Sequence, residues 1–257
     1  MNEYFKNIEE LFVVGSDISN SIEHKFLQLN IDEESLEMQV FYFFHSKVRK
    51  TYQAIKLLWD KGFSEDAFIL SRTLYEISLQ ARYIQSDPQL LVERYLRFDP
   101  VRRWKHYLNF KKNADRALVQ ELEEKSSKSL EELKKLHDES MGKFNYKGQN
   151  WWGDTIEWLA LKLGNGKDSI YSGLYPIQSG FVHSDVRSSR SYIKFAGYDE
   201  EFKGATSLQD DIVIPVESTR CLILVAWSTS KICGFKMDQE ISSAIEQVRR
   251  LSGMGNK

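Results

Sequence analysis

Arg72 and Glu76 are the two residues in this sequence whose types and spacing are best suited to chemistry. They are four positions apart, which places them one turn apart on the same face of a helix. Phe68, Leu79 and Tyr83 share that face, so an ion pair formed there is partly buried and must be well hydrogen-bonded. Such a pair has one of two roles. It links helices structurally, or the glutamate orients the arginine to bind a phosphate or carboxylate.

His183 is the second residue with a chemical role to consider, because it follows a segment rich in aromatic and hydroxyl side chains. It can act as a general acid or base, or as a cation at the C-terminus of the helix that it ends. If two inward-facing helices bring His183 to Arg72 and Glu76, with Arg187 beside it, the four residues form a polar site inside a bundle. We therefore take Arg72, Glu76 and His183 as candidate catalytic residues and Arg187 as a candidate binding residue.

A stretch that is both basic and aromatic, residues 94–112, is the candidate for nucleic-acid binding. Its cations are interleaved with aromatic side chains, a combination typical of proteins that bind single-stranded nucleic acid. The alternative is that the aromatic residues form the core stripe of a helix while the cations are solvated on its outer face. The candidate binding residues in this stretch are Arg94, Arg102 and Arg103.

The common metal and nucleotide motifs are absent from the sequence. Its five histidines show no HxH, HxxxH or HExxH spacing. No GxxxxGK[ST], GxGxxG or GxSxG motif occurs. The two cysteines, Cys221 and Cys233, have the spacing of neither a disulfide framework nor a metal clip. We therefore expect no metal and no cofactor.

The charge balance limits the partners that the whole chain can attract. There are 35 Lys and Arg residues against 37 Asp and Glu, a net charge of −2, so binding to nucleic acid requires a local patch. The N-terminus lacks the pattern of a signal peptide, and the most apolar run, 221–227, is far too short to span a bilayer. These observations predict a cytoplasmic protein that does not bind membranes.

Apolar residues recur at three- and four-residue steps over most of the chain, and only four prolines and fourteen glycines interrupt it. This pattern predicts an all-α fold, a multi-helix bundle of long amphipathic helices with at most a minor β element. Strand-prone pieces occur at 191–196 and 211–214. The helices are expected at about 4–29, 36–59, 64–85, 88–98, 100–112, 154–163, 168–183, 217–233 and 238–251.

Several residues are predicted to begin, end or break these helices. Ser64, Asp87 and Asp99 are expected to be N-caps, the last two with proline at the first helical position. Gly62 is expected to be a C-cap, and Pro176 is expected to kink its helix.

The domain organisation is predicted from the absence of repeats and of clear linkers. One helical domain spanning 1–257 is expected, with the helix 64–85 at its centre because that helix is apolar on more than one side. The highly charged segment 115–140, which has only a thin seam of leucines, is predicted to form a protruding helical hairpin. Residues 141–153, rich in Gly, Asn and aromatics, are expected to form a loop.

Three short stretches together resemble domain-of-unknown-function family 5677, a family of uncharacterised bacterial helical proteins. They are residues 67–76, then Arg94-Tyr95-Leu96 with Arg102 downstream, then Tyr175 through Phe181-Val182-His183-Ser184. The similarity covers about 36–235. It implies an all-helical fold in which the Arg/Glu helix and the His-bearing helix recur, and it implies no particular activity.

The bundle and its Phe-Val-His ending are also similar to the HEPN class of helical proteins, many of which are RNases in toxin and anti-phage systems. That class places four to six residues between an arginine and a histidine on one helix, whereas the nearest approach here, Arg102 to His106, has three. The resemblance therefore implies a binding, sensor or partner subunit in a defence or stress locus. Association through an apolar helix face, in a homo-oligomer or with a protein partner, is expected whichever function holds. An enzyme acting on RNA or nucleotides through Arg72, Glu76 and His183 is the alternative, so whether the chain is an enzyme stays open.

Overall fold

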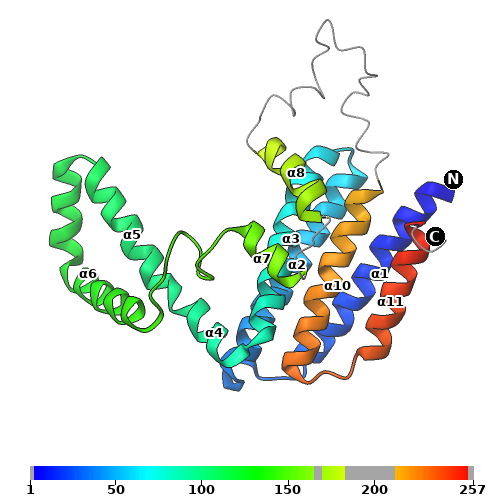
Figure 1. Ribbon diagram of the computed structural model, residues 1–257, viewed down its shortest axis with the longest axis horizontal. Helices are drawn as coiled ribbons and strands as arrows, with labels where there is room; N and C mark the ends of the chain where they lie inside the picture. The colour runs from blue at the N-terminus through cyan, green and yellow to red at the C-terminus, as the bar shows by residue number, and fades with distance from the viewer. Residues whose placement is uncertain (1–2, 165–169, 183–211, 254–257) are drawn as a thin grey trace, which may run out of the picture. The chain divides into compact units, whose positions relative to one another are not determined.

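The computed structural model describes residues 3–164, 170–182 and 212–253, which belong to two compact units. The first unit comprises 1–86 and 159–257, and the second comprises 87–158. Within the described ranges every regular element is a helix, so the all-α prediction is confirmed (Figure 1). None of these helices is long and apolar enough to cross a membrane. The prediction that the whole chain is one domain stays a prediction.

The first unit is a bundle of long helices connected to shorter ones (Figure 1). Its long helices are α1 (Glu3–Phe26), α2 (Leu36–Asp60), α3 (Ser64–Ser86), α10 (Val213–Cys233) and α11 (Asp238–Leu251). The shorter elements are a 3-10 turn (Ile31–Glu33), α7 (Ile156–Leu163, which begins in the second unit), a π-helical turn (Ile170–Leu174) and α8 (Tyr175–Val182).

The helix at the centre of this bundle is α10 rather than α3. It packs against α1, α2, α3 and α11, and the apolar run 221–227 forms its middle. The strand-prone assignment of 211–214 is wrong for Val213 and Ile214, which lie in the first turn of α10. Burial of Ile214 inside the bundle outweighs the preference of β-branched residues for strands. The other strand-prone piece, 191–196, lies outside the described residues.

Two of the predicted helix ends are confirmed. Asp87 caps α4 (Pro88–Leu96), since its carboxylate accepts a hydrogen bond from the Leu90 N–H at 3.3 Å, and Pro88 begins the helix. Gly62, with a φ of 82°, ends α2 in the left-handed conformation that glycine adopts easily. Pro176 lies in the first turn of α8, directly after the π-helical turn, so the expected break in the helix 168–183 occurs there.

Two of the predicted N-caps are wrong. Ser64 begins α3, but its buried Oγ makes no hydrogen bond with any described residue. Asp99 lies inside α5 (Phe98–Asn113) rather than before it, and its carboxylate is 3.7 Å from Arg103 Nη1. The helix begins two residues earlier than expected, and Pro100 still lies in its first turn, where an N–H would have no helical carbonyl to bond.

The second unit contains α4, α5 and α6 (Arg116–Phe144), with α5 and α6 packed against each other. Residues 115–140, expected as a protruding hairpin, form most of α6, which is bent at Ser126 (φ −122°, ψ 18°). The predicted loop at 141–153 begins later than expected, because α6 continues to Phe144 and ends at Asn145 in a left-handed conformation (φ 45°).

Candidate functional site

The predicted ion pair between Arg72 and Glu76 is present on α3. Arg72 Nε donates to Glu76 Oε1 at 2.9 Å, and the two side chains are 19% and 35% exposed. The pair is therefore partly buried, as the apolar neighbours in the sequence indicate.

Tyr175, the first residue of α8, completes a closed triangle with this pair. Arg72 Nη2 donates to the Tyr175 hydroxyl at 2.8 Å, and that hydroxyl donates to Glu76 Oε1 at 2.9 Å. The Tyr175 ring also lies under the guanidinium, with its centre 4.5 Å from Arg72 Cζ, a cation–π distance. We call these three residues the Arg72–Tyr175 cluster, and it joins α8 to α3.

The protonation states in the cluster follow from burial and from neighbouring charges. Burial, together with the Glu76 carboxylate, raises the pKa of Tyr175 to about 12, so its hydroxyl stays neutral and donates. Burial opposes the charge on Arg72, but hydrogen bonds to Glu76 and Tyr175 outweigh it and raise the pKa of the guanidinium. At neutral pH the Arg72 guanidinium is therefore charged and the Tyr175 hydroxyl is a neutral donor.

Neighbouring side chains hold the cluster in place. The Tyr171 ring stacks on the Tyr175 ring with a centroid distance of 5.1 Å. One turn along α8, Gln178 Nε2 donates to Ser71 Oγ at 2.7 Å. These contacts limit the freedom of Tyr175, and through it the freedom of Arg72.

The other two residues expected at this site, His183 and Arg187, lie outside the described residues. Their meeting with Arg72 and Glu76 stays a prediction. Among the residues that the structure does describe, no group of three or more His, Cys, Asp or Glu side chains is placed to hold a metal ion.

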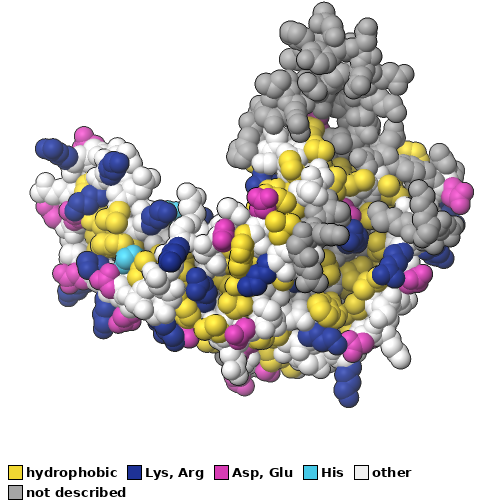
Figure 2. All heavy atoms as spheres, viewed as in Figure 1, with side chains coloured by type: hydrophobic (Ala, Val, Ile, Leu, Met, Phe, Trp, Pro, Cys, Tyr) yellow, Lys and Arg dark blue, Asp and Glu magenta, His cyan; other side chains and the backbone are white. Residues whose placement is uncertain are grey.

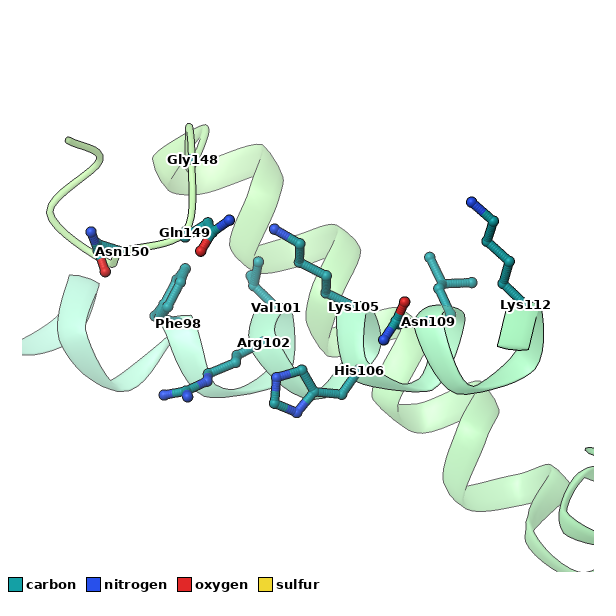
Figure 3. A pocket seen from close by; sticks show the side chains of 11 residues that line it. Phe98, Val101, Arg102, Lys105, His106, Asn109, Lys112, Gly148, Gln149 and Asn150 are labelled. Atoms are coloured by element: carbon teal, nitrogen blue, oxygen red, sulfur yellow. The ribbon is translucent and has the colours of Figure 1, made fainter. Parts of the chain in front are cut away.

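The second candidate site is a groove of about 610 Å³ along α5, in the second unit (Figure 3). In the close-up, Lys105 and Lys112 extend to the same side of α5 as Gln149, whereas Arg102 extends to another side. We call this the α5 groove. Its lining residues are Phe98, Val101, Arg102, Lys105, His106, Leu108, Asn109, Lys112, Gly148, Gln149 and Asn150.

The α5 groove is lined by cations and contains no carboxylate. Arg102, Lys105 and Lys112 line it, and none of these three side chains has an ion pair or hydrogen bond with any residue in the described part of the chain. Other cations of α5 are paired instead. Arg103 lies beside Asp99, and Lys111 Nζ is 2.6 Å from a carboxylate oxygen of Glu123.

Two of the candidate binding residues from the basic stretch lie elsewhere. The Arg94 guanidinium anchors the loop after α6, donating to the Trp151 carbonyl at 2.7 Å and lying 5.0 Å from the Tyr146 ring centre. Arg103 is exposed on α5 and faces Asp99. The structure thus leaves Arg102 in the groove and assigns Arg94 a structural contact.

The aromatic residues of α5 have two different environments. Trp104 and Tyr107 face α6, with the Trp104 ring 6.0 Å from the His137 ring and the Tyr107 hydroxyl donating to Glu123. Phe98 lines the groove, and Phe110, 38% exposed, lines an adjoining hollow of about 530 Å³ that shares His106 and Asn109 with it. No residue of α5 is fully buried, so a core stripe accounts for only part of its aromatic content.

Comparison with known proteins identifies the family. A model of the family of unknown function DUF5677 matches residues 38–201. The chain belongs to the DUF5677 family. No curated protein and no solved structure matches it. The likeness to HEPN proteins stays a prediction.

Both candidate sites lie within the DUF5677 match. The matched residues include α3, α5 and α8, whereas α1, α10 and α11 lie outside it. Sequence reasoning named Tyr175 only as the start of the stretch that ends at His183 and Ser184, because the contact with Arg72 spans 103 residues. The candidate residues chosen from the sequence did not include Lys105 and Lys112. The signal that could have indicated them is that residues 100–114 contain no acidic residue.

Proposed function

We propose that this DUF5677 protein is a partner or sensor subunit that binds single-stranded nucleic acid along the α5 groove. The observation that carries the proposal is that three cations, Arg102, Lys105 and Lys112, line a groove without a carboxylate and form no ion pair with any residue in the described part of the chain. Unpaired cations keep their full attraction for phosphate, whereas Arg103 and Lys111 are already partly neutralised. The first and last of the three cations are ten positions apart on the helix, roughly 15 Å at 1.5 Å per residue.

Aromatic side chains favour a single strand over a duplex. Phe98 and Phe110 line the groove and its adjoining hollow, and unpaired bases stack on such rings without regard to sequence. Figure 2 shows Lys and Arg side chains, together with Asp and Glu and apolar side chains, on the surface of α5 and α6.

The test is a fluorescence-anisotropy titration with a labelled single-stranded oligonucleotide at several salt concentrations. Three phosphate contacts predict a slope of about −2 in a plot of log K against log salt, using roughly −0.7 per contact for single strands. Replacing Arg102, Lys105 and Lys112 with glutamine is expected to weaken binding at least about tenfold and to remove most of that slope.

A matched control removes the same charge from the same unit. Arg103, Lys125 and Lys134 each lie beside a carboxylate on the helix surface. Replacing these three with glutamine is expected to change the affinity by less than about threefold, because paired surface cations attract phosphate weakly. Equal losses from the two triple variants, or a preference for duplex, would contradict the groove as a single-strand site.

The alternative function is an enzyme that acts on RNA or nucleotides through Arg72, Glu76 and His183. The specific observation in its favour is that Arg72 and Glu76 do meet in a half-buried position. Its test is incubation of the wild-type chain with RNA and a gel that resolves the products. Cleavage that is lost on His183→Ala supports the enzyme, and intact RNA with retained binding supports the subunit. We place either function in the cytoplasm, with a homo-oligomer or a protein partner.

A further inference from the structure

A cavity of about 330 Å³ between α10 and α11 belongs to neither the Arg72–Tyr175 cluster nor the α5 groove. Its size is near the lower end of the range for small-molecule pockets, about 300–1,000 Å³. Both helices belong to the first unit and pack against each other, and Figure 1 shows them side by side and antiparallel. We call this cavity the α10–α11 cleft.

The lining of the α10–α11 cleft is mostly aliphatic. Ile223 and Val248 line it and are almost fully buried in the bundle, whereas Ile245, which also lines it, is 37% exposed. Leu224 adds a fourth aliphatic side chain. These side chains come from both helices, so an apolar group in the cleft contacts both and leaves water on doing so.

The other lining residues are two arginines, Arg220 of α10 and Arg249 of α11, and one serine, Ser252. No Asp or Glu within the described ranges lines the cleft. A ligand with a negative charge therefore meets two cations and no carboxylate on the wall, and a ligand with a positive charge meets neither partner that it needs.

The two arginines keep hydrogen-bond donors that no residue in the described part of the chain uses. Arg220 Nη1 donates to Glu217 Oε1 at 2.6 Å, and that glutamate side chain is only 11% exposed. Arg249 Nη1 is 3.6 Å from Glu246 Oε2, too long for a hydrogen bond, and both of these side chains are exposed. A guanidinium carries five N–H donors, so most of them are left for an anion. Because each ion pair weakens the attraction for an anion, tight binding also requires apolar contact.

The cationic and apolar groups lie at different ends of the cleft. Residues 234–237 connect the two helices, so position along the cleft can be counted from this turn. Arg220 lies 13 residues before the end of α10 and Leu224 lies 9 before it. Arg249 lies 11 residues after the start of α11 and Ile245 lies 7 after it. On both helices the arginine is thus roughly 6 Å farther from the turn than the aliphatic residue, at 1.5 Å per residue.

We propose that the α10–α11 cleft binds an aliphatic monocarboxylate. The carboxylate accepts hydrogen bonds from the guanidiniums of Arg220 and Arg249, a pairing whose geometry suits arginine. The aliphatic chain extends from there toward the turn and covers the four aliphatic side chains. Apolar contact supplies most of the affinity, and the arginines select the charge of the head group and its end of the cleft.

This site goes beyond the proposed nucleic-acid function, because α10 and α11 belong to the first unit and α5 to the second. A variant without Arg220 and Arg249 is expected to keep its affinity for a single-stranded oligonucleotide. Loss of one activity therefore leaves the other intact.

Isothermal titration calorimetry of the full wild-type chain with sodium octanoate, sodium butanoate and octylammonium chloride tests the ligand class. Burying one methylene raises affinity by at most about fourfold, so octanoate is expected to bind at least about tenfold more tightly than butanoate. Octylammonium has the same alkyl chain as an aliphatic amine with the opposite charge, and it is expected to bind at least about tenfold more weakly than octanoate.

The double variant Arg220→Gln with Arg249→Gln places the carboxylate at this cleft. It is expected to bind octanoate at least about tenfold more weakly than the wild type. The matched control is Lys231→Gln with Arg250→Gln, because these cations lie on the same two helices and do not line the cleft. Each of them also lies beside a carboxylate. The control is expected to change the affinity by less than about threefold.

A further variant, Ile245→Glu, tests the apolar part of the cleft. Ile245 is partly exposed, so glutamate there can reach water and the chain is expected to fold, as judged by circular dichroism. Its carboxylate repels the ligand, and octanoate binding at least about tenfold weaker is expected. Octanoate binding that shows the expected chain-length and charge dependence, and that both cleft variants weaken, supports the site. No octanoate binding by the wild type, butanoate or octylammonium bound as tightly, or unchanged binding in either folded cleft variant overturns it.

Discussion

Replacing Gly15 with alanine is expected to lower the free energy of unfolding by about 2 kcal/mol, although alanine is the better helix former. A Cβ at Gly15 would lie 2.3 Å from the Tyr52 hydroxyl oxygen and 2.5 Å from Tyr52 Cζ. Overpacking a core costs about 1–3 kcal/mol, and sometimes more, whereas the gain in helix propensity is about 1 kcal/mol.

The ring of Tyr52 has little freedom to move away from a new methyl group. Its hydroxyl is 2.7 Å from Thr219 Oγ1 and donates to the Leu11 carbonyl at 3.2 Å, which ties α2 to α10 and α1. Burial raises the pKa of Tyr52 well above its usual value, so this hydroxyl stays protonated across the physiological range.

Urea unfolding followed by circular dichroism measures the effect, with Gly142→Ala as the matched control. Gly142 lies in α6, and a Cβ added there would meet no atom within 4 Å, so alanine is expected to raise stability by about 0.5–1 kcal/mol. Adding Tyr52→Phe to Gly15→Ala removes the nearest clashing atom, and the double variant is expected to lose less than the sum of the two single losses. A Gly15→Ala variant as stable as the wild type would contradict this prediction, because it would show that α1 and α2 move apart at little cost in free energy.

The features that could be predicted from the sequence are those that depend on near neighbours in the chain. The ion pair of Arg72 and Glu76 follows from a spacing of four on a helix, and the cap at Asp87 from an Asp-Pro step. The first turn of α10 was not predicted to be helical because its structure depends on tertiary contacts. Its β-branched residues favour strands locally, but burial against other helices decides the outcome.

The site residues that were missed depend on contacts between distant parts of the chain. Tyr175 reaches Arg72 only because α8 packs on α3, and no periodicity within either helix indicates which faces meet. The basic stretch poses the same problem on a smaller scale. Arg94 and Arg102 are equivalent as residue types, and only the fold shows that the first anchors a loop while the second lines a groove.

Acidification from about pH 7 to about pH 5 is expected to reduce the free energy of unfolding by about 2 kcal/mol through His45 alone. His45 lies in α2 with its side chain only 3% exposed, and within the described part of the chain its Nε2 makes no hydrogen bond. Burial, and then the charge of Arg49, lower the pKa of His45 from 6.5 to about 4. Glu23 on α1 lies 3.5 Å from Nε2, but it is a quarter exposed and does not offset the burial.

The direction of this change in stability follows from comparing proton binding by His45 in the folded and unfolded states. Below pH 6.5 the unfolded chain protonates His45, whereas the folded chain keeps it neutral until about pH 4. Protons therefore favour the unfolded state in that window, and stability falls by about 1.4 kcal/mol per pH unit there. Below the folded pKa both states are protonated, and the loss levels off at about 3 kcal/mol.

Urea unfolding at a series of pH values, for the wild type and for His45→Gln, isolates this contribution from that of the carboxylates. The variant is expected to be less stable at neutral pH and to lose less stability on acidification, because glutamine does not titrate. His24, exposed on α1, serves as the matched position, and His24→Gln is expected to keep the pH profile of the wild type. If the free energy of unfolding changed in parallel for His45→Gln and the wild type between about pH 6.5 and about pH 4, His45 would have to be protonated to the same extent in the folded and unfolded states. A buried imidazolium beside Arg49 makes that arrangement costly.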